Sequence, residues 1–236
     1  MSFDEKSRGA EWARKGMTAQ FGWEGEKPDP DAAVSYYEKA IECRNVAAMN
    51  NLGVIYLYHR EDHESAYHWY LEAALGGCKE SLANLGKMYY LGVFVDRDLQ
   101  KAHLYFEEAY KAGVRDACLY LGYFAQAGLL GKVDLKSARK YYEDGMSRGC
   151  GGCALNLGVM YMKGQGVPED KKKGVECYQF AYSKGFYLAY SNLGWCYENG
   201  QGVARDMLKA ITYYREGVQK GNEKCEAALK RLHIKV

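Results

Sequence analysis

The chain lacks long apolar runs. No stretch of its 236 residues is long and apolar enough to span a membrane. The first residues, MSFDEKSRGAEWARKG, carry charges throughout and lack the apolar segment of a secretory signal peptide. We therefore expect a cytoplasmic protein that makes no membrane contact.

An excess of either charge is also missing. The 32 Lys and Arg residues nearly balance the 30 Asp and Glu residues, so the formal net charge is only +2. The two signs are interspersed along the chain, whereas a nucleic-acid-binding or membrane-binding face would need a basic cluster. We expect no nucleic acid as a partner.

Proline and phenylalanine are scarce, with 3 and 7 residues, whereas tyrosine occurs 22 times. Tyrosine has an apolar body and a polar tip, which suits helix packing near the surface as well as protein recognition.

What the chain does contain is a repeat. An aspartate stands four residues before a small residue six times, at Asp29/Ala33, Asp62/Ala66, Asp98/Ala102, Asp134/Ala138, Asp170/Gly174 and Asp206/Ala210. A glycine precedes each aspartate by about a dozen residues: Gly16, Gly53, Gly86, Gly122, Gly158 and Gly194. The second interval between these glycines is 33 residues, and each of the next three is 36. A fixed period of this length predicts a solenoid of stacked helix pairs.

The fifth repeat shows the expected design. Its first helix has the apolar spacing of an amphipathic helix, and Gly158 leaves room for the second helix to approach closely. Gly164-Gln165-Gly166-Val167 ends that helix, because glycine accepts a left-handed C-cap. Asp170 is expected to accept hydrogen bonds from the free amides that begin the second helix.

We predict an all-α fold, a right-handed α-α superhelical solenoid that forms a single domain over residues 1–236. Its repeats are predicted at 11–47, 48–80, 81–116, 117–152, 153–188 and 189–224, with a capping helix within 225–236. The short final helix places Ala228, Leu229 and Leu232 on one side, and terminal repeats of solenoids need such a cover.

The pattern A-x-x-x-L-G-x-x-Y-x-x-G-x-G-V-x-x-D-x-x-K-A-x-x-Y-Y resembles the Sel-one-like repeat family, a branch of the tetratricopeptide-like superhelical proteins. The resemblance extends over about residues 8–224 and is strongest in the fifth and sixth repeats. It implies a role as an adaptor, as in protein quality control, bacterial signalling, host interaction or effector immunity. A disulfide-rich branch linked to β-lactam binding pairs two cysteines in every repeat, and that pattern is absent here.

The eight cysteines show no such pairing. They fall at mixed repeat positions: Cys43, Cys78, Cys118, Cys150, Cys153, Cys177, Cys196 and Cys225. An even number of cysteines in a secreted chain would suggest disulfides. We expect instead mostly free, buried thiols in a reducing compartment.

An asparagine column is the most informative polar feature. Two residues before the repeat glycine stand Asn51, Asn84, Asn156 and Asn192, with Tyr120 and Arg14 as exceptions. In related superhelices the first helices line a concave groove, where an amide can donate to and accept from the backbone of a bound peptide. The alternative is that each asparagine bonds a segment of its own or the neighbouring repeat.

Other first-helix positions complete the predicted groove. By helical spacing, the partner-binding residues include Tyr58, Lys87, Tyr90, Tyr123, Trp195 and Glu198, with Val54, Gln126, Val159 and Met162 at or near the same side. Aromatic and polar residues of this kind are enriched in protein interfaces. Any one of them could instead be a half-buried packing residue.

Two other groupings give only weak signals. Cys150-Gly-Gly-Cys153 lacks the second ligand pair that a zinc site needs, and a redox motif of this kind belongs in a βαβ setting. His59 and His63 fall where the aligned repeats place a loop, so we expect a solvated loop rather than a metal site. No catalytic set emerges, and we expect no cofactor or metal.

We therefore predict a non-catalytic scaffold, monomeric when alone, that holds a protein or peptide segment in its concave groove. An immunity or inhibitor protein that binds one folded partner is the main alternative, and an enzyme is a distant one.

Overall fold

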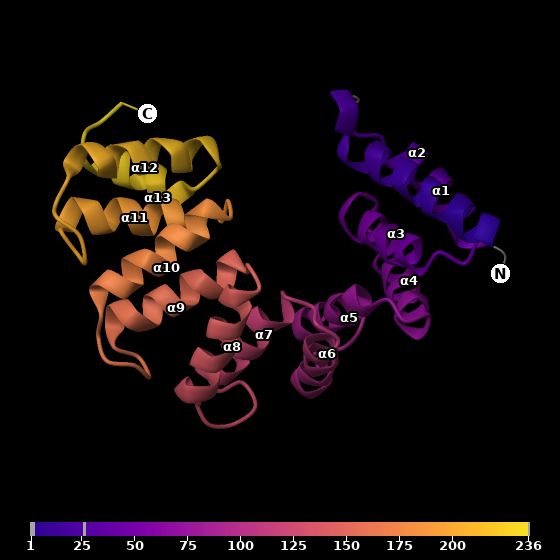
Figure 1. Cartoon of the computed structure of the whole chain (residues 1–236), viewed down its shortest axis with the longest axis horizontal. Helices are drawn as coiled ribbons and strands as arrows, with labels where there is room; N and C mark the ends of the chain where they lie inside the picture. Colours follow the sequence, from indigo (N-terminus) through magenta and orange to yellow (C-terminus); the bar gives the residue numbers. More distant parts are fainter. Residues whose placement is uncertain (1–2, 26, 236) are drawn as a thin grey trace. The chain divides into compact units, whose positions relative to one another are not determined.

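A computed structural model describes residues 3–25 and 27–235, and the backbone within these ranges forms helices and loops without strands (Figure 1). The chain divides into two compact units, residues 1–114 and 115–236. The first unit contains α1 (Phe3–Phe21), a short 3-10 helix (Trp23–Gly25), α2 (Pro30–Glu42), α3 (Val46–Tyr58), α4 (His63–Leu75), α5 (Lys79–Leu91) and α6 (Leu99–Lys111). The second contains α7 (Ala117–Ala127), α8 (Leu135–Ser147), α9 (Gly151–Lys163), α10 (Lys171–Ser183), α11 (Leu188–Asn199), α12 (Met207–Gln219) and α13 (Glu223–Arg231).

Consecutive helices pack in pairs. In the first unit α1 packs on α2, α3 on α4 and α5 on α6, and in the second α7 packs on α8, α9 on α10 and α11 on α12. Within each unit, the second helix of one pair contacts the first helix of the next. This arrangement confirms the predicted all-α fold of stacked helix pairs. No helix of the described ranges is long and apolar enough to cross a membrane.

All six repeat aspartates cap the second helix of their pair. In the third pair, the Asp98 carboxylate accepts hydrogen bonds from the backbone N–H groups of Gln100 and Lys101, at 3.0 and 2.9 Å. The same role falls to Asp29, Asp62, Asp134, Asp170 and Asp206. These bonds satisfy backbone donors that have no partner inside the helix, which confirms the predicted caps.

The caps of three pairs also hold a lysine against a tyrosine of the preceding helix. The ammonium group of Lys101 lies 3.9 Å from the Asp98 carboxylate and 5.2 Å from the ring centre of Tyr89. The fifth and sixth pairs repeat this arrangement with Asp170, Lys173 and Tyr161 and with Asp206, Lys209 and Tyr197. The Y…D-x-x-K part of the repeat pattern is therefore a structural motif, in which a cation–π contact supports a helix cap.

Each repeat glycine faces an aromatic ring of the second helix. A Cβ atom added to Gly158 would stand 2.6 Å from the nearest ring carbon of Tyr178, which confirms the close approach expected from the sequence. The other glycines face Tyr37, Tyr70, Phe106, Tyr142 and Tyr214 at 2.3–2.8 Å. These six rings are among the most buried side chains of the chain. A side chain at any of the six glycines would push the two helices apart.

The predicted glycine C-cap recurs in four pairs. Gly164 ends α9 with a φ of 65°, and α5, α7 and α11 end in the same left-handed conformation at Gly92, Gly128 and Gly200. The second pair has the shorter loop, and there Glu61 takes a φ of 52° without a glycine. The 33-residue interval thus comes from a different turn between α3 and α4.

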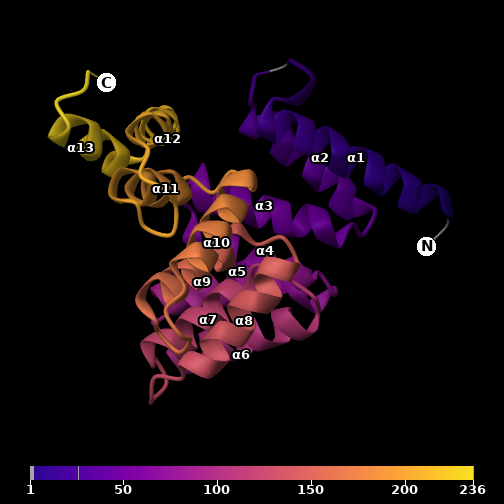
Figure 2. The same ribbon diagram turned by 60° about the vertical axis from the view of Figure 1, so that its left-hand side comes forward.

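The C-terminal helix α13 covers the last pair. It lies beside α12 and α11 (Figure 2). Leu229 is fully buried in a cluster with Tyr214 and Cys225, and Ala228 and Leu232 pack against the same cluster. The predicted capping helix is therefore present, with the predicted apolar side facing the repeat array.

Candidate protein-binding site

The predicted partner-binding residues all lie on the first helices of their pairs. Five belong to the first unit, with Asn51 and Tyr58 on α3 and Asn84, Lys87 and Tyr90 on α5. The other five belong to the second unit, with Tyr123 on α7, Asn156 on α9 and Asn192, Trp195 and Glu198 on α11.

The asparagines of the first unit bond within the chain. The side-chain amide of Asn84 donates to the Asn50 Oδ1 atom at 2.9 Å, and Ser81 donates to the same atom at 2.9 Å. The Asn50 amide in turn donates to Asn51 Oδ1 at 3.3 Å, and Lys87 donates to Asn84 Oδ1 at 3.4 Å. The two asparagines are therefore joined across neighbouring first helices by Asn50, a residue outside the predicted column.

Two members of the column interact with the tyrosine of the preceding pair. Burial raises the pKa of Tyr37 to about 12, and a side-chain interaction with Asn51 opposes that rise. Burial likewise raises the pKa of Tyr142, against an interaction with Asn156. In the fourth pair, Tyr120 replaces the asparagine of the column.

Asn192 has a different environment. Its side chain makes no hydrogen bond within the described part of the chain, and it lines two hollows in the second unit together with Trp195. One hollow, of about 400 Å³, lies between α9 and α11 and is also lined by Val159, Met162 and Tyr178. The other, of about 420 Å³, lies between α11 and α13 and is lined by Ala227, Ala228 and Arg231. We call these two hollows together the Trp195 surface.

Trp195 is the main apolar feature of this surface. Trp195 remains 47% exposed, although Tyr190 and Leu193 of the same helix are buried. The small residues Ala227 and Ala228 leave space beside it. Tryptophan is enriched among the residues that contribute most of the binding energy in protein interfaces.

Glu198 is buried under the C-terminal helix, with 8% of its surface exposed. Its Oε2 atom accepts a hydrogen bond from the Tyr214 hydroxyl at 2.8 Å and an ion-paired bond from Arg231 at 2.7 Å. The hydrogen bond from Arg231 is the largest influence that holds the pKa of Glu198 below its usual value. In this structure the Glu198 carboxylate joins α11, α12 and α13, so it is occupied within the chain.

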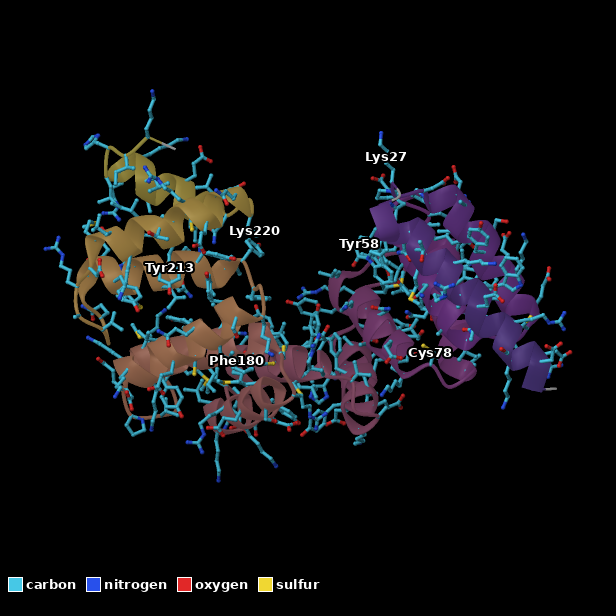
Figure 3. The ribbon with its side chains drawn as sticks, turned by 45° about the horizontal axis from the view of Figure 1, so that its top comes forward. Lys27, Tyr58, Cys78, Phe180, Tyr213 and Lys220 are labelled. Atoms are coloured by element: carbon cyan, nitrogen blue, oxygen red, sulfur yellow. The ribbon has the colours of Figure 1, made fainter. Side chains whose placement is uncertain are left out.

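The remaining predicted residues differ in exposure. Tyr58, which is labelled in Figure 3, is 67% exposed, and Tyr123 is 42% exposed. Tyr90 is half-buried, with the Arg97 guanidinium 5.9 Å from its ring centre. By contrast, Tyr213 on α12, which is labelled in Figure 3, stacks on Tyr197 and meets the edge of the Tyr182 ring.

All eight cysteines are free, and seven of them are buried. Cys150 is the N-cap residue of α9, where its sulfur accepts a hydrogen bond from the Cys153 amide at 3.4 Å. A side-chain hydrogen bond from Cys153 lowers the pKa of Cys150 to about 7, and the same bond raises the pKa of Cys153. This C-x-x-C pair therefore begins a helix rather than forming part of a loop site.

The histidine pair flanks a helix cap. His59 ends α3, His63 begins α4, and Asp62 between them caps α4. Among the residues that the structure describes, no group of three or more His, Cys, Asp or Glu side chains is arranged to hold a metal ion.

Comparison with known proteins identifies the repeat. The Sel1 repeat matches the sequence six times, over residues 16–45, 46–78, 79–114, 115–143, 152–186 and 188–222. The chain belongs to the Sel1 repeat family. Sel1 repeat proteins are typically protein-interaction scaffolds.

Solved structures of Sel1 repeat proteins share the fold. The crystal structure of a Sel1 repeat protein from Oxalobacter formigenes is 26% identical, with a TM-score of 0.79, and the match covers 94% of this chain and 87% of that chain. The protective antigen c5321 of uropathogenic Escherichia coli is 25% identical, with a TM-score of 0.71, over 98% of this chain and 51% of that chain. The immunity protein PA5088 from Pseudomonas aeruginosa, 19% identical with a TM-score of 0.68, matches over 93% of this chain and 82% of that chain. No curated protein sequence matches the chain.

Proposed function

We propose that this Sel1 repeat chain is a non-catalytic scaffold that binds a segment of a partner protein at first-helix surfaces, above all at the Trp195 surface. The observation that carries the proposal is the pairing of Asn192, whose amide has no partner in the described chain, with the half-exposed ring of Trp195 between two hollows. The signature positions of the repeat are occupied by helix caps and ring packing. The surface that remains variable is therefore the one available for recognition.

The four asparagines of the column have different roles in this proposal. Asn51, Asn84 and Asn156 interact with side chains of neighbouring helices, so their amides stabilise the array first. Asn192 is free to donate to a carbonyl group and to accept from an amide of the bound segment. Tyr58 and Tyr123 offer further exposed aromatic contacts within their own units.

A test compares two tryptophans of similar exposure. Trp195 is 47% exposed and Trp23, in the first unit, is 51% exposed. Tagged wild-type protein, Trp195→Ala and Trp23→Ala are used to capture partners from a lysate of the source cells. We expect wild type and Trp23→Ala to retain the same partners, and Trp195→Ala to lose them, because truncating a central aromatic anchor usually costs about 2 kcal/mol or more of binding energy.

Partners that Trp195→Ala retains at wild-type levels would contradict a binding role for the Trp195 surface. One folded protein retained in equal amount by the wild type and both variants would favour the alternative of a dedicated inhibitor. Solved proteins of this fold that are described as immunity proteins, such as PA5088 and Pa5087 of Pseudomonas aeruginosa, give that alternative a precedent in fold only.

A further inference from the structure

The charges around the Trp195 surface are unequal in number. The hollow between α9 and α11 is lined by Lys163 and Lys171 against a single carboxylate, that of Glu169. The hollow between α11 and α13 is lined by Lys224 and Arg231, and no carboxylate lines it. The chain as a whole carries a formal net charge of only +2, so this imbalance is a local feature.

Internal ion pairs account for only part of the positive charge. Lys171 pairs with Glu169 at 3.3 Å, and Arg231 pairs with the buried carboxylate of Glu198 at 2.7 Å. Lys163 and Lys224 form no ion pair within the described part of the chain. One ammonium group without an anionic partner therefore lines each hollow, and no lining carboxylate is left without a cation.

The surface between these two lysines is apolar and hydrogen-bonding. Trp195 belongs to both hollows, with Val159 and Met162 on the α9 side and Ala228 on the α13 side. Asn192 also lines both hollows and supplies an amide that has no partner among the described residues. An occupant that matches this arrangement needs an apolar side chain near its middle and negative charge toward both ends.

We propose that the Trp195 surface binds an acidic, extended segment of a partner protein, with an apolar residue against Trp195 and carboxylates at Lys163 and Lys224. This inference rests on the proposed scaffold function and specifies the chemistry of its partner. Asn192 bonds the backbone of the segment, because an amide side chain can donate and accept at once. The complementary charges also speed association and disfavour basic segments.

The charge count favours a peptide over a nucleic acid as the occupant. A nucleic acid carries a phosphate at every nucleotide, and proteins that bind it line a continuous track with Lys and Arg. The Trp195 surface offers two unpaired cations and one exposed aromatic ring. Two separated carboxylates on a peptide satisfy these cations without leaving further negative charge unmatched.

The test uses synthetic peptides with the full-length chain. Fluorescein-labelled decapeptides carry a central Phe flanked on both sides by Asp and Glu, by Asn and Gln, or by Lys and Arg, and binding is followed by fluorescence anisotropy. We expect the acidic peptide to bind about threefold to tenfold more tightly than the neutral one, because it can form an exposed ion pair with each of the two lysines. Binding should weaken as salt rises.

Variants assign the effect to the two lysines. Lys163→Gln with Lys224→Gln should remove the preference for the acidic peptide, and Lys163→Glu with Lys224→Glu should reverse it toward the basic peptide. The matched control is Lys140→Gln with Lys220→Gln, two exposed lysines of the second unit outside both hollows, of which Figure 3 labels Lys220. The control should bind as wild type does, and circular dichroism checks that every variant is folded.

The outcomes separate this inference from the proposed function. Peptides that bind equally whatever their charge, and that are lost in Trp195→Ala, would overturn the acidic preference while the scaffold function stands. Displacement of the acidic peptide by single-stranded DNA at equal concentration would overturn it in favour of a nucleic acid. Binding of the acidic peptide that Trp195→Ala does not weaken would contradict both proposals.

Discussion

At the scale of single residues, five of the six rings that cover the repeat glycines are tyrosines, and the sixth, Phe106, lacks the hydroxyl group. The residue four positions after the glycine differs accordingly. The hydroxyl groups of Tyr37, Tyr142 and Tyr214 donate to acceptors four residues after the glycine, Gln20, Gln126 and Glu198, at 2.7–2.8 Å. Phe106 has no hydroxyl group and needs no acceptor, and Tyr90 occupies that position. The second and fifth pairs depart from this rule, because Leu57 and Met162 stand at the acceptor position. Among the described residues, the buried hydroxyl of Tyr70 has no hydrogen-bond partner.

This difference predicts opposite effects for the same substitution. Tyr70→Phe removes a buried hydroxyl that has no partner, so we expect the free energy of unfolding to rise by up to about 1 kcal/mol. Tyr214→Phe removes a donor to the buried Glu198 carboxylate, and we expect a fall of about 1–3 kcal/mol. Urea unfolding of the two variants beside wild type measures both values. Equal losses in the two variants would show that Tyr70 has a partner in solution.

At the scale of elements, local chemistry made the helices predictable from the sequence. An aspartate cap, a glycine C-cap and a glycine under a ring each act within one repeat, so the spacing of Asp170, Gly164 and Gly158 already contains them. The candidate site depends on longer-range partners that no repeat position specifies. Glu198 is covered by Arg231 of α13, a helix outside the repeat, and Asn84 bonds Asn50 of the preceding pair.

The repeat pattern therefore places the asparagine column on the first helices, but it does not predict which of its amides bond within the chain. Asn84 and Asn192 occupy the same repeat position, and only their neighbours distinguish them. In the first unit, Asn50 directly precedes Asn51, so the sequence shows a second amide beside the column. The partner of the Asn50 oxygen, however, is Asn84 of α5, and that contact depends on how α3 and α5 are placed.

The caps predict a specific response to acid. Hydrogen bonds from Ser137, first from its hydroxyl and then from its backbone amide, hold the pKa of Asp134 below its ordinary value of 3.8. A carboxyl group whose pKa is lowered on folding contributes stability that is present above 3.8 and is lost as the pH falls through the lowered value. Asp134→Asn keeps an acceptor oxygen and does not titrate. We expect this variant to match wild type near neutral pH and to lose less stability in acid.

Thermal unfolding at several pH values measures this response. Asp134→Ala serves as the control, because it has no acceptor and should be less stable than wild type at neutral pH as well. An acid response of Asp134→Asn identical to that of wild type would contradict the titration of this cap.

At the scale of the whole molecule, thiol reactivity reports how firmly the helix pairs are closed. Burial raises the pKa of Cys118 and Cys196 to about 12, and both side chains are fully buried. Cys150 has its pKa lowered to about 7 but is only 5% exposed, so access limits its reaction more than ionisation does. Cys43 is the one cysteine that is not buried.

We expect Ellman's reagent to label eight thiols in denaturant, because all eight are free. In the native protein only Cys43 should react quickly, and the others should react at the rate of local opening. Cys43→Ser should abolish the fast phase. Fewer than eight thiols in denaturant would reveal a disulfide, and a fast phase that survives in Cys43→Ser would show that a buried pair opens readily.

The ring that closes on each repeat glycine also fixes the position of the residue that follows it. Those six residues are Met17, Val54, Lys87, Tyr123, Val159 and Trp195, and each is exposed or half-buried. Their chemistry ranges from aliphatic to cationic to aromatic although the glycine before them never changes. Each repeat thus presents one variable side chain next to a recurring contact between a glycine and a ring. Under the proposed function, exchanging these residues one repeat at a time would change the partner that is bound without altering the contacts between the glycines and the rings.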